Sequence, residues 1–155
     1  MKILMVCLGN ICRSPIAEGI LRRKIEKNKL SHTVESAGTG AWHVGEKPDI
    51  RAIRTAKKFG VDISKIKARK FLAKYLSEFD KIYVMDHENY ENVISLARPK
   101  DDQSKVQLIL NADQPGSDRI VPDPYYDDDG FENVFKMIDK ACDAIIKELI
   151  NEKKI

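Results

Sequence analysis

The chain has 155 residues, of which 43% are hydrophobic and 33% are charged, with 27 Lys and Arg against 24 Asp and Glu, a formal charge of +3. Eight Gly and six Pro are too few for a collagen-like or low-complexity protein, and three Cys are too few for a secreted disulfide scaffold. No apolar run approaches the roughly 20 residues that a membrane helix needs.

The first six residues are too short and unflanked for a signal peptide, so we expect a cytoplasmic protein. Its length suits a single domain over residues 1–155. A small net charge does not argue for nucleic acid as a partner, and we expect a monomer that binds neither nucleic acid nor membranes.

Strands and helices alternate along the chain. Residues 3–6 form a continuous apolar run, typical of a strand buried on both faces. Ser14 suits a helix cap and Pro15 the first helical turn. The predicted elements are strands at 3–6, 33–36, 81–85 and 106–110, and helices from Ser14 and at 49–59, 87–96 and 133–150. This order predicts a three-layer α/β architecture, with a parallel sheet covered by helices on both faces.

The helix at 49–59 has Ile50, Ile53 and Phe59 at helical spacing, and Gly60 is placed to end it. Residues 111–130, in contrast, contain three Pro and many Asp without periodicity. An irregular segment this long in a compact domain indicates function.

The most informative segment is Cys7-Leu8-Gly9-Asn10-Ile11-Cys12-Arg13-Ser14-Pro15, which joins the first strand to the first helix. In an open parallel sheet, ligands bind beyond the carboxyl ends of the strands, where this loop must lie. Gly9 permits a tight curl, and backbone N–H groups at the helix start form an anion cradle. Arg13 adds a planar fork that matches two phosphate oxygens.

Cys7 lies at the base of this positively charged loop. The helix dipole, the inward amides and Arg13 all favour the thiolate over the thiol, and Ser14 is placed to donate a hydrogen bond to the sulfur. The loop would therefore both create a nucleophile and bind a tetrahedral anion for it to attack. A Cys at a strand end is by itself usually a small buried hydrophobe, so the hypothesis depends on the whole constellation.

A leaving group needs a proton, and the best candidate donor is Asp123, in Val121-Pro122-Asp123-Pro124-Tyr125-Tyr126. Proline on both sides makes the loop stiff. Alone, this Asp would be interpreted as a turn residue. Tyr125 and Tyr126 could form a wall for a flat substrate ring.

These features resemble those of low-molecular-weight protein tyrosine phosphatases. The resemblance spans nearly the whole chain and depends on the Cys-x5-Arg-Ser loop, the Ser36-Ala37-Gly38-Thr39 segment, Trp42 and the Asp123-Pro124-Tyr125-Tyr126 motif. It implies four parallel strands in flavodoxin-like order, no metal or other cofactor, phosphotyrosine-containing proteins as substrates, and inorganic phosphate as product and inhibitor.

The resemblance also implies roles for individual residues. Cys7 would be the nucleophile, Arg13 the phosphate clamp, and Asp123 the general acid and later the base that activates water. The residues implied to bind substrate are Leu8, Gly9, Asn10, Ile11, Cys12, Ser14, Trp42, Tyr125 and Tyr126. Among these, Leu8, Trp42 and Tyr125 would line a slot for the phosphotyrosine ring, and Ser14 would stabilise the thiolate. Ser36 would support the loop, and Asn10 and Ser36 would belong to a hydrogen-bond network that holds the loop in shape.

Cys12 would in addition trap oxidised Cys7 as a disulfide, which is plausible because an exposed thiolate oxidises readily; the alternative is a small buried filler. Cys142 lies on the apolar stripe of the last helix and is expected in the core. Asp86 and Asn89 would belong to a supporting hydrogen-bond network.

Two related activities occur within the same fold. Thioredoxin-coupled arsenate reductases need two further cysteines in mid-chain, and none occurs between Cys12 and Cys142. Protein arginine phosphatases usually have Thr where this chain has Ile11, and they lack the paired Tyr after Asp-Pro. Ile11 and Tyr125 therefore favour an aryl phosphate as substrate.

Two other classes of protein remain as alternatives. A non-catalytic phosphate-binding module would need Arg13 and the amides but neither Cys7 nor Asp123. A phosphocysteine carrier must hold its phosphate, and Arg13 with Asp123 argues against that. The basic clusters at 22–24 and 65–70 are interpreted as solvated surface, Asp127-Asp128-Asp129 as a turn, and the three His as lacking a metal-ligand pattern.

Overall fold

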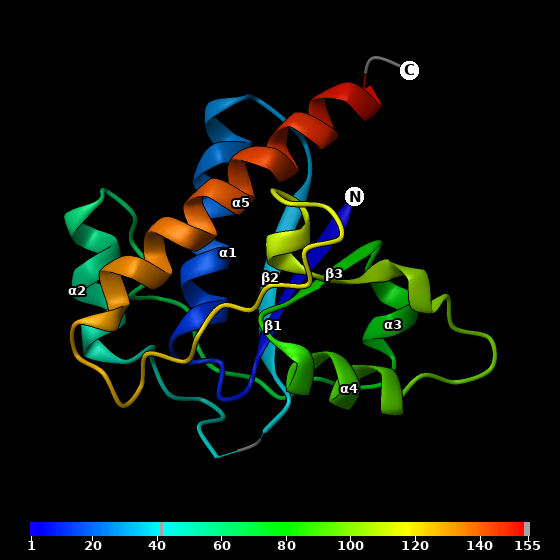
Figure 1. Cartoon of the computed structure of the whole chain (residues 1–155), viewed down its shortest axis with the longest axis horizontal. Coiled ribbons are helices and arrows are strands. Elements are labelled where there is room, and N and C mark those ends of the chain that lie inside the picture. The colour runs from blue at the N-terminus through cyan, green and yellow to red at the C-terminus, as the bar shows by residue number, and fades with distance from the viewer. Residues whose placement is uncertain (41, 154–155) are drawn as a thin grey trace.

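The computed structural model describes residues 1–40 and 42–153. Its centre is one sheet of four parallel strands in the order β2-β1-β3-β4 (Figure 1). The strands are β1 (Lys2–Cys7), β2 (Thr33–Gly38), β3 (Lys81–Val84) and β4 (Val106–Leu108). Helices cover both faces, which confirms the predicted three-layer α/β fold with flavodoxin-like strand order.

The apolar run in β1 contributes to two separate cores. Side chains alternate across a strand, so Ile3 and Met5 pack on one face of the sheet while Leu4 and Val6 pack on the other. All four are fully buried. A central strand with helices on both sides has no solvent-exposed face, which explains why polar and apolar residues do not alternate in this run.

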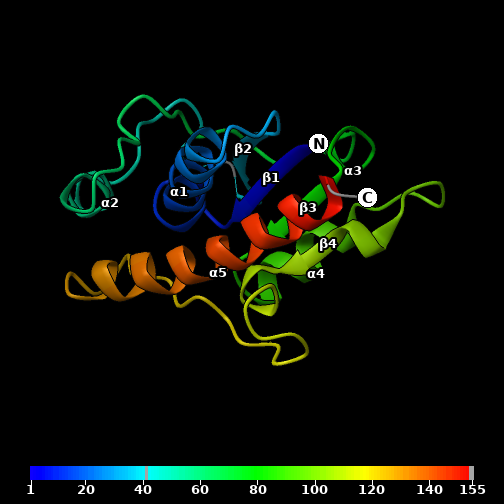
Figure 2. The same cartoon turned by 90° about the horizontal axis from the view of Figure 1, so that it is seen from above.

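Three helices share the core on the Ile3 and Met5 side: α1 (Arg13–Lys27), α2 (Ile50–Lys58) and α5 (Gly130–Lys153). The other side holds α3 (Tyr75–Glu78) and α4 (His87–Ser95). Figure 2 shows α1 and α5 beside the strands, with α2 at the outer end of this layer. No helix within the described ranges is both long enough and apolar enough to span a membrane.

Several boundaries differ from the prediction. β4 ends at Leu108 and continues as the 3-10 turn Ile109–Asn111, whose Ile109 and Leu110 are buried although they are not in the sheet. An apolar run therefore does not show where a strand becomes a turn. The last helix begins at Gly130, three residues earlier than expected, and buries Phe131. The single turn of α3 was not predicted.

The orientation of α2 also differs. Ile50 was expected on its apolar face but is exposed, and the buried residues of α2 are Ala52 and Ala56. Small residues let α2 pack closely, and the helix packs mainly against α5 and α1.

The loops that follow β1, β3 and β4 meet at one edge of the sheet, because parallel strands direct their carboxyl ends the same way. The loop after β1, called here the first loop (residues 8–12), leads directly into α1. The segment between the 3-10 turn and α5, called here the long loop (residues 112–129), is tied to the end of β3 by a hydrogen bond from Val121 N to Met85 O of 2.8 Å.

Candidate active site

Cys7 is the last residue of β1, and its sulfur receives hydrogen bonds from the first loop and from α1. The Asn10 backbone N–H donates to Cys7 Sγ at 3.3 Å, and Ser14 Oγ lies 3.0 Å from the same sulfur. Asn10 Nδ2 donates to Ser14 Oγ at 2.7 Å, so the Ser14 hydroxyl hydrogen has two possible acceptors, the Cys7 sulfur at 3.0 Å and the Ala37 carbonyl at 3.5 Å, of which a Cys7 thiolate is the charged one. Donors of this kind stabilise a thiolate.

The prediction that Ser14 caps α1 is wrong. The helix begins at Arg13, and its N-cap is Cys12, which makes no side-chain capping hydrogen bond. Ser14 lies inside the first turn, and its hydroxyl is directed to Cys7 instead. The N–H groups of the first turn therefore have no side-chain cap, which suits a helix end that binds an anion.

Asn10 holds the first loop in shape. Its backbone is in the left-handed region (φ 56°), which Asn tolerates better than most residues. Its side chain donates to Ser36 Oγ at 3.0 Å and accepts from the Arg69 N–H at 2.9 Å. Asn10, Ser14 and Ser36 are all buried, and none of them lines the cavity described below. Their side chains therefore support the first loop from the side away from the cavity.

A glycine at the end of β2 lets the first loop approach this closely. A Cβ on Gly38 would lie 2.8 Å from the Leu8 carbonyl oxygen and 3.0 Å from the Asn10 nitrogen. Backbone atoms cannot move aside as a flexible side chain would, so any other residue here displaces the loop.

The buried network continues to a carboxylate that the sequence analysis missed. Ser36 Oγ donates to Glu18 Oε1 at 2.6 Å, and Arg22 Nη2 donates to Glu18 Oε2 at 2.5 Å. Glu18 and Arg22 are four residues apart on α1, a spacing that places them on one helical face. That spacing was visible in the sequence, but the contact with Ser36 on β2 was not.

The Arg13 guanidinium is buried beside Cys7 and fixed at one end. Its Nη1 donates to the Asp86 carboxylate at 2.7 Å and to the Val121 carbonyl at 2.9 Å, and its Nη2 lies 3.7 Å from the Asp123 carboxylate. Burial alone lowers the pKa of Arg13, but the negative charges of Cys7 and Asp86 raise it above its ordinary value. A fixed positive charge therefore lies at the base of the site.

The carboxylate that holds Arg13 is itself held by a capping box at the start of α4. Asp86 accepts from the Asn89 N–H at 2.9 Å, and the Asn89 side chain accepts from the Asp86 N–H at 3.2 Å. Both residues lie where the resemblance implied a supporting network.

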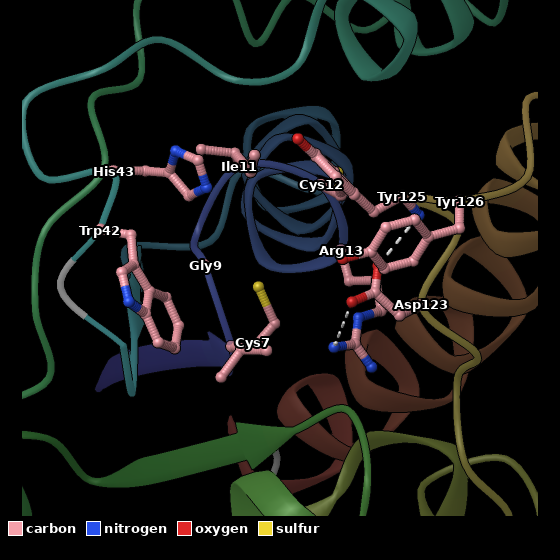
Figure 3. Close-up of a pocket in the computed structure, with 11 residues that line it drawn as sticks. Cys7, Gly9, Ile11, Cys12, Arg13, Trp42, His43, Asp123, Tyr125 and Tyr126 are labelled. Carbon is pink, nitrogen blue, oxygen red and sulfur yellow. Dashed lines mark hydrogen bonds and ion pairs between the residues drawn. The ribbon is translucent and has the colours of Figure 1, made fainter.

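These groups open into a cavity of about 340 Å³, within the range typical of small-ligand sites. Figure 3 shows Trp42 and His43 on one side of Cys7, with Asp123, Tyr125 and Tyr126 on the other. The lining residues are Cys7, Leu8, Gly9, Ile11, Cys12, Arg13, Trp42, His43, Asp123, Tyr125 and Tyr126. Residues more than 100 positions apart in the chain thus face one another across one cavity.

The aromatic walls are exposed. Trp42 has 71% of its surface accessible and Tyr126 has 93%, and the rings of Tyr125 and Tyr126 meet edge to face with centroids 5.0 Å apart. Exposed aromatic rings around a cavity are typical of a binding surface. The Trp42 ring also lies against Gly40, where a Cβ would come within 2.0 Å of it.

His43 lines the cavity although the sequence analysis assigned it no role. Its Nδ1 lies 2.7 Å from the Glu46 carboxylate. Its position next to Trp42 was the only signal in the sequence. Within the described part of the chain, no cluster of three or more His, Cys, Asp and Glu is arranged to hold a metal ion.

The three cysteines differ in their surroundings. Burial raises the pKa of Cys12 strongly, and the negative charges of Cys7 and Asp49 raise it further. Burial likewise raises the pKa of Cys142, which is fully buried in the core as predicted. A raised pKa favours the neutral thiol, which is a poorer nucleophile than a thiolate.

We expect iodoacetamide to modify Cys7 faster than the other two thiols of the folded protein at neutral pH, and inorganic phosphate to slow that reaction. Peptide mass spectrometry after timed labelling measures this directly. Faster labelling of Cys12 or Cys142 than of Cys7 would contradict the assignment.

A parallel sheet, a Cys-x5-Arg loop at the end of its first strand and an Asp facing that loop are together the features of one class of protein, the phosphatases with a Cys-x5-Arg loop. The family model described as low molecular weight phosphotyrosine protein phosphatase matches residues 2–155, and the chain belongs to this family. It is accordingly a hydrolase that acts on phosphotyrosine.

Individual relatives agree. The low molecular weight phosphotyrosine protein phosphatase of Schizosaccharomyces pombe is 43% identical over 138 residues, which cover 86% of this chain and 87% of the relative. The crystal structure of YfkJ from Bacillus subtilis has a TM-score of 0.91 at 35% identity and covers 99% of this chain and 96% of its own. The crystal structure of a Drosophila arginine phosphatase has a TM-score of 0.89 at 31% identity, and the match covers 96% of this chain and 98% of the arginine phosphatase.

Proposed function

We propose that this phosphatase hydrolyses phosphotyrosine in proteins through a phosphocysteine on Cys7, with Asp123 as general acid and then general base. The observation that carries the proposal is the convergence of Cys7, Arg13 and Asp123 in one cavity. The non-catalytic alternative gives no reason for a hydrogen-bonded sulfur and a carboxylate to face each other there.

In the first step, the Cys7 thiolate attacks phosphorus and the bond to the tyrosine oxygen breaks. The protonated Asp123 carboxyl gives its proton to that oxygen, so tyrosine leaves as a neutral phenol. Arg13 Nη2 and the N–H groups of the first loop hold the equatorial oxygens as charge moves through the transition state.

In the second step, a water molecule attacks the phosphorus of the phosphocysteine. The Asp123 carboxylate accepts a proton from this water, and the sulfur–phosphorus bond breaks. The products are inorganic phosphate, the Cys7 thiolate and protonated Asp123, so the enzyme returns to its starting state. Free phosphate fits the same donors, and we therefore infer that it is a competitive inhibitor.

The walls of the cavity support an aryl phosphate as substrate. Leu8, Trp42 and Tyr125 line it with apolar and aromatic surface that suits a phenyl ring. The Drosophila arginine phosphatase shares this fold, so the fold does not decide the substrate. Ile11 and Tyr125, both on the cavity wall, are the residues on which the preference for phosphotyrosine depends.

We expect the purified protein to hydrolyse 4-nitrophenyl phosphate and a phosphotyrosine peptide equally well with and without EDTA, because the mechanism uses only side chains and water. A phosphoarginine peptide, compared at the same concentrations, should be at least about 10-fold poorer in kcat/KM. Activity that appears only after a metal is added would contradict the mechanism, and a preference for phosphoarginine would contradict the substrate assignment.

A further inference from the structure

The long loop carries Asp123 without any helix or strand of its own, so its position depends on individual contacts. On the amino-terminal side of Asp123, Val121 is fixed at both backbone atoms. Its N–H donates to Met85 O at 2.8 Å, and its carbonyl accepts from Arg13 at 2.9 Å. This side is thus attached to β3 and to the Arg13 guanidinium.

On the other side of Asp123, the attachment is made by Arg51 of α2. Arg51 Nη2 donates to the Tyr125 carbonyl at 2.9 Å, and Nη1 pairs with the Asp128 carboxylate. The guanidinium also lies over the Tyr125 ring, 5.5 Å from its centroid, and over the Phe131 ring, at 4.8 Å. One side chain therefore contacts the long loop at Tyr125 and Asp128 and the first turn of α5 at Phe131.

Arg51 is in turn fixed by Asp49. Its Nε donates to Asp49 Oδ1 at 3.0 Å and its Nη2 to Asp49 Oδ2 at 2.9 Å, a two-pronged ion pair. Asp49 also caps α2 through the Arg51 N–H at 2.8 Å, and its own N–H donates to the Ile11 carbonyl at 2.8 Å. Arg51 thereby connects the first loop, through Asp49, to the long loop.

The connection reaches the Asp123 carboxylate through Tyr125. The Tyr125 N–H donates to Asp123 Oδ1 at 3.0 Å, while the carbonyl of the same residue is held by Arg51. Asp123 is otherwise loosely held, because 39% of its side chain is exposed and Arg13 Nη2 lies 3.7 Å away. The backbone of Tyr125 is thus the part of the loop that orients the carboxylate.

We propose that Arg51 is a positioning residue for proton transfer: by holding Tyr125, it keeps the Asp123 carboxyl at the leaving-group oxygen. The inference rests on the proposed role of Asp123 as general acid. A displacement of about 1 Å in a reacting group can lower a rate roughly 100-fold, so an anchor two residues from the carboxylate has a large effect. Lysine cannot replace this fork, since it has no second N–H group fixed at the required angle.

The test compares Arg51→Ala, Arg51→Lys and the control Arg54→Ala. Arg54 lies on the same helix, is exposed, and has no ion pair with any residue in the described ranges. The readout is kcat/KM for a series of aryl phosphates that differ in leaving-group pKa, because this parameter reports the step that forms the phosphocysteine. Circular dichroism and the affinity for vanadate show whether each variant is folded with an intact first loop.

We expect Arg51→Ala to lose roughly 10- to 100-fold with phenyl phosphate and less than about 3-fold with 2,4-dinitrophenyl phosphate, whose leaving group needs no proton. The kcat/KM of Arg51→Lys for phenyl phosphate should lie between those of Arg51→Ala and wild type, and Arg54→Ala should have wild-type values with both substrates. In the double variant Arg51→Ala/Asp123→Asn, kcat/KM for phenyl phosphate should be less than about 3-fold below that of Asp123→Asn alone. The two changes remove the same function, proton donation to the leaving group, so their effects should not add.

An equal loss with both substrates, or a full additional loss in the double variant, would overturn the positioning role while leaving the phosphatase mechanism intact. If Arg51→Ala fails to fold, Arg51→Lys is tested with the same two substrates. A leaving-group dependence of kcat/KM equal to that of wild type would then overturn the inference. If Asp123→Asn alone loses kcat/KM equally with both substrates, the general-acid role of Asp123 is wrong. That result is distinct from a failure of the positioning role of Arg51, which leaves the effect of Asp123→Asn in place.

Discussion

The Cys7→Ser variant is expected to lose at least about 10⁴-fold in kcat/KM for aryl phosphates and still to bind phosphate or vanadate. A serine hydroxyl stays protonated at neutral pH and is a poor nucleophile without a base beside it. The anion donors do not depend on the sulfur, because Arg13 is held by Asp86 and Val121. Steady-state kinetics and isothermal titration with inorganic phosphate measure the two properties separately.

The matched control is Cys142→Ala, which changes a cysteine buried in the core between α5 and the sheet. This variant should retain wild-type activity per folded molecule and lose about 1 kcal/mol of unfolding free energy, because only one sulfur atom's packing is removed. A Cys7→Ser variant that kept the wild-type rate would refute the nucleophile. Loss of phosphate binding together with activity would show instead that the first loop had collapsed.

The second large effect is expected for Asp123→Asn, and it should depend on the leaving group. Asparagine keeps the size of the side chain and an oxygen that can accept the Tyr125 N–H, but it has no acidic proton to give. We expect kcat/KM to fall roughly 10²- to 10⁴-fold for phenyl phosphate and less than about 10-fold for 2,4-dinitrophenyl phosphate.

Asp127→Asn is the control for that experiment. Asp127 is exposed on the same loop and accepts a hydrogen bond from the Asp129 N–H, which the amide oxygen of asparagine preserves. It should leave the rates with both substrates unchanged. Equal losses for the two substrates in Asp123→Asn would remove the acid role from Asp123, whatever the size of the loss.

The sheet and the Cys-x5-Arg loop could be predicted from the sequence because both follow from short-range patterns. A strand buried on both faces has to be continuously apolar, as in residues 3–6, and the loop signature occupies seven consecutive residues. Asp123 was expected to face Cys7 on chemical grounds, because the leaving group needs a proton donor, and because the Asp-Pro-Tyr-Tyr motif resembles that of the family. The structure adds the reason why they can meet: parallel strands bring the loops after β1 and β4 to one edge of the sheet.

Other parts could not be predicted, because they depend on contacts between side chains far apart in the chain. Arg51 meets Tyr125 and Asp128, more than 70 residues away, and no local pattern distinguishes it from Arg54. Ser14 satisfied a capping rule, but the helix begins one residue earlier, and the Ser14 hydroxyl lies 3.0 Å from the Cys7 sulfur instead. Ile50 fitted a helical stripe, yet the helix packs through alanines that hydrophobic spacing ranks lower.

The most direct test of the central claim is to locate the covalent phosphate. The Asp123→Asn protein is mixed with 2,4-dinitrophenyl phosphate, stopped with denaturant within milliseconds, and digested with trypsin. The peptide of residues 3–13 contains both Cys7 and Cys12, so fragmentation must assign the site. Phosphate on Cys7, formed as fast as the first equivalent of dinitrophenol, is the predicted result. Phosphate on any other residue, or a burst of dinitrophenol with no phosphopeptide, would contradict the mechanism.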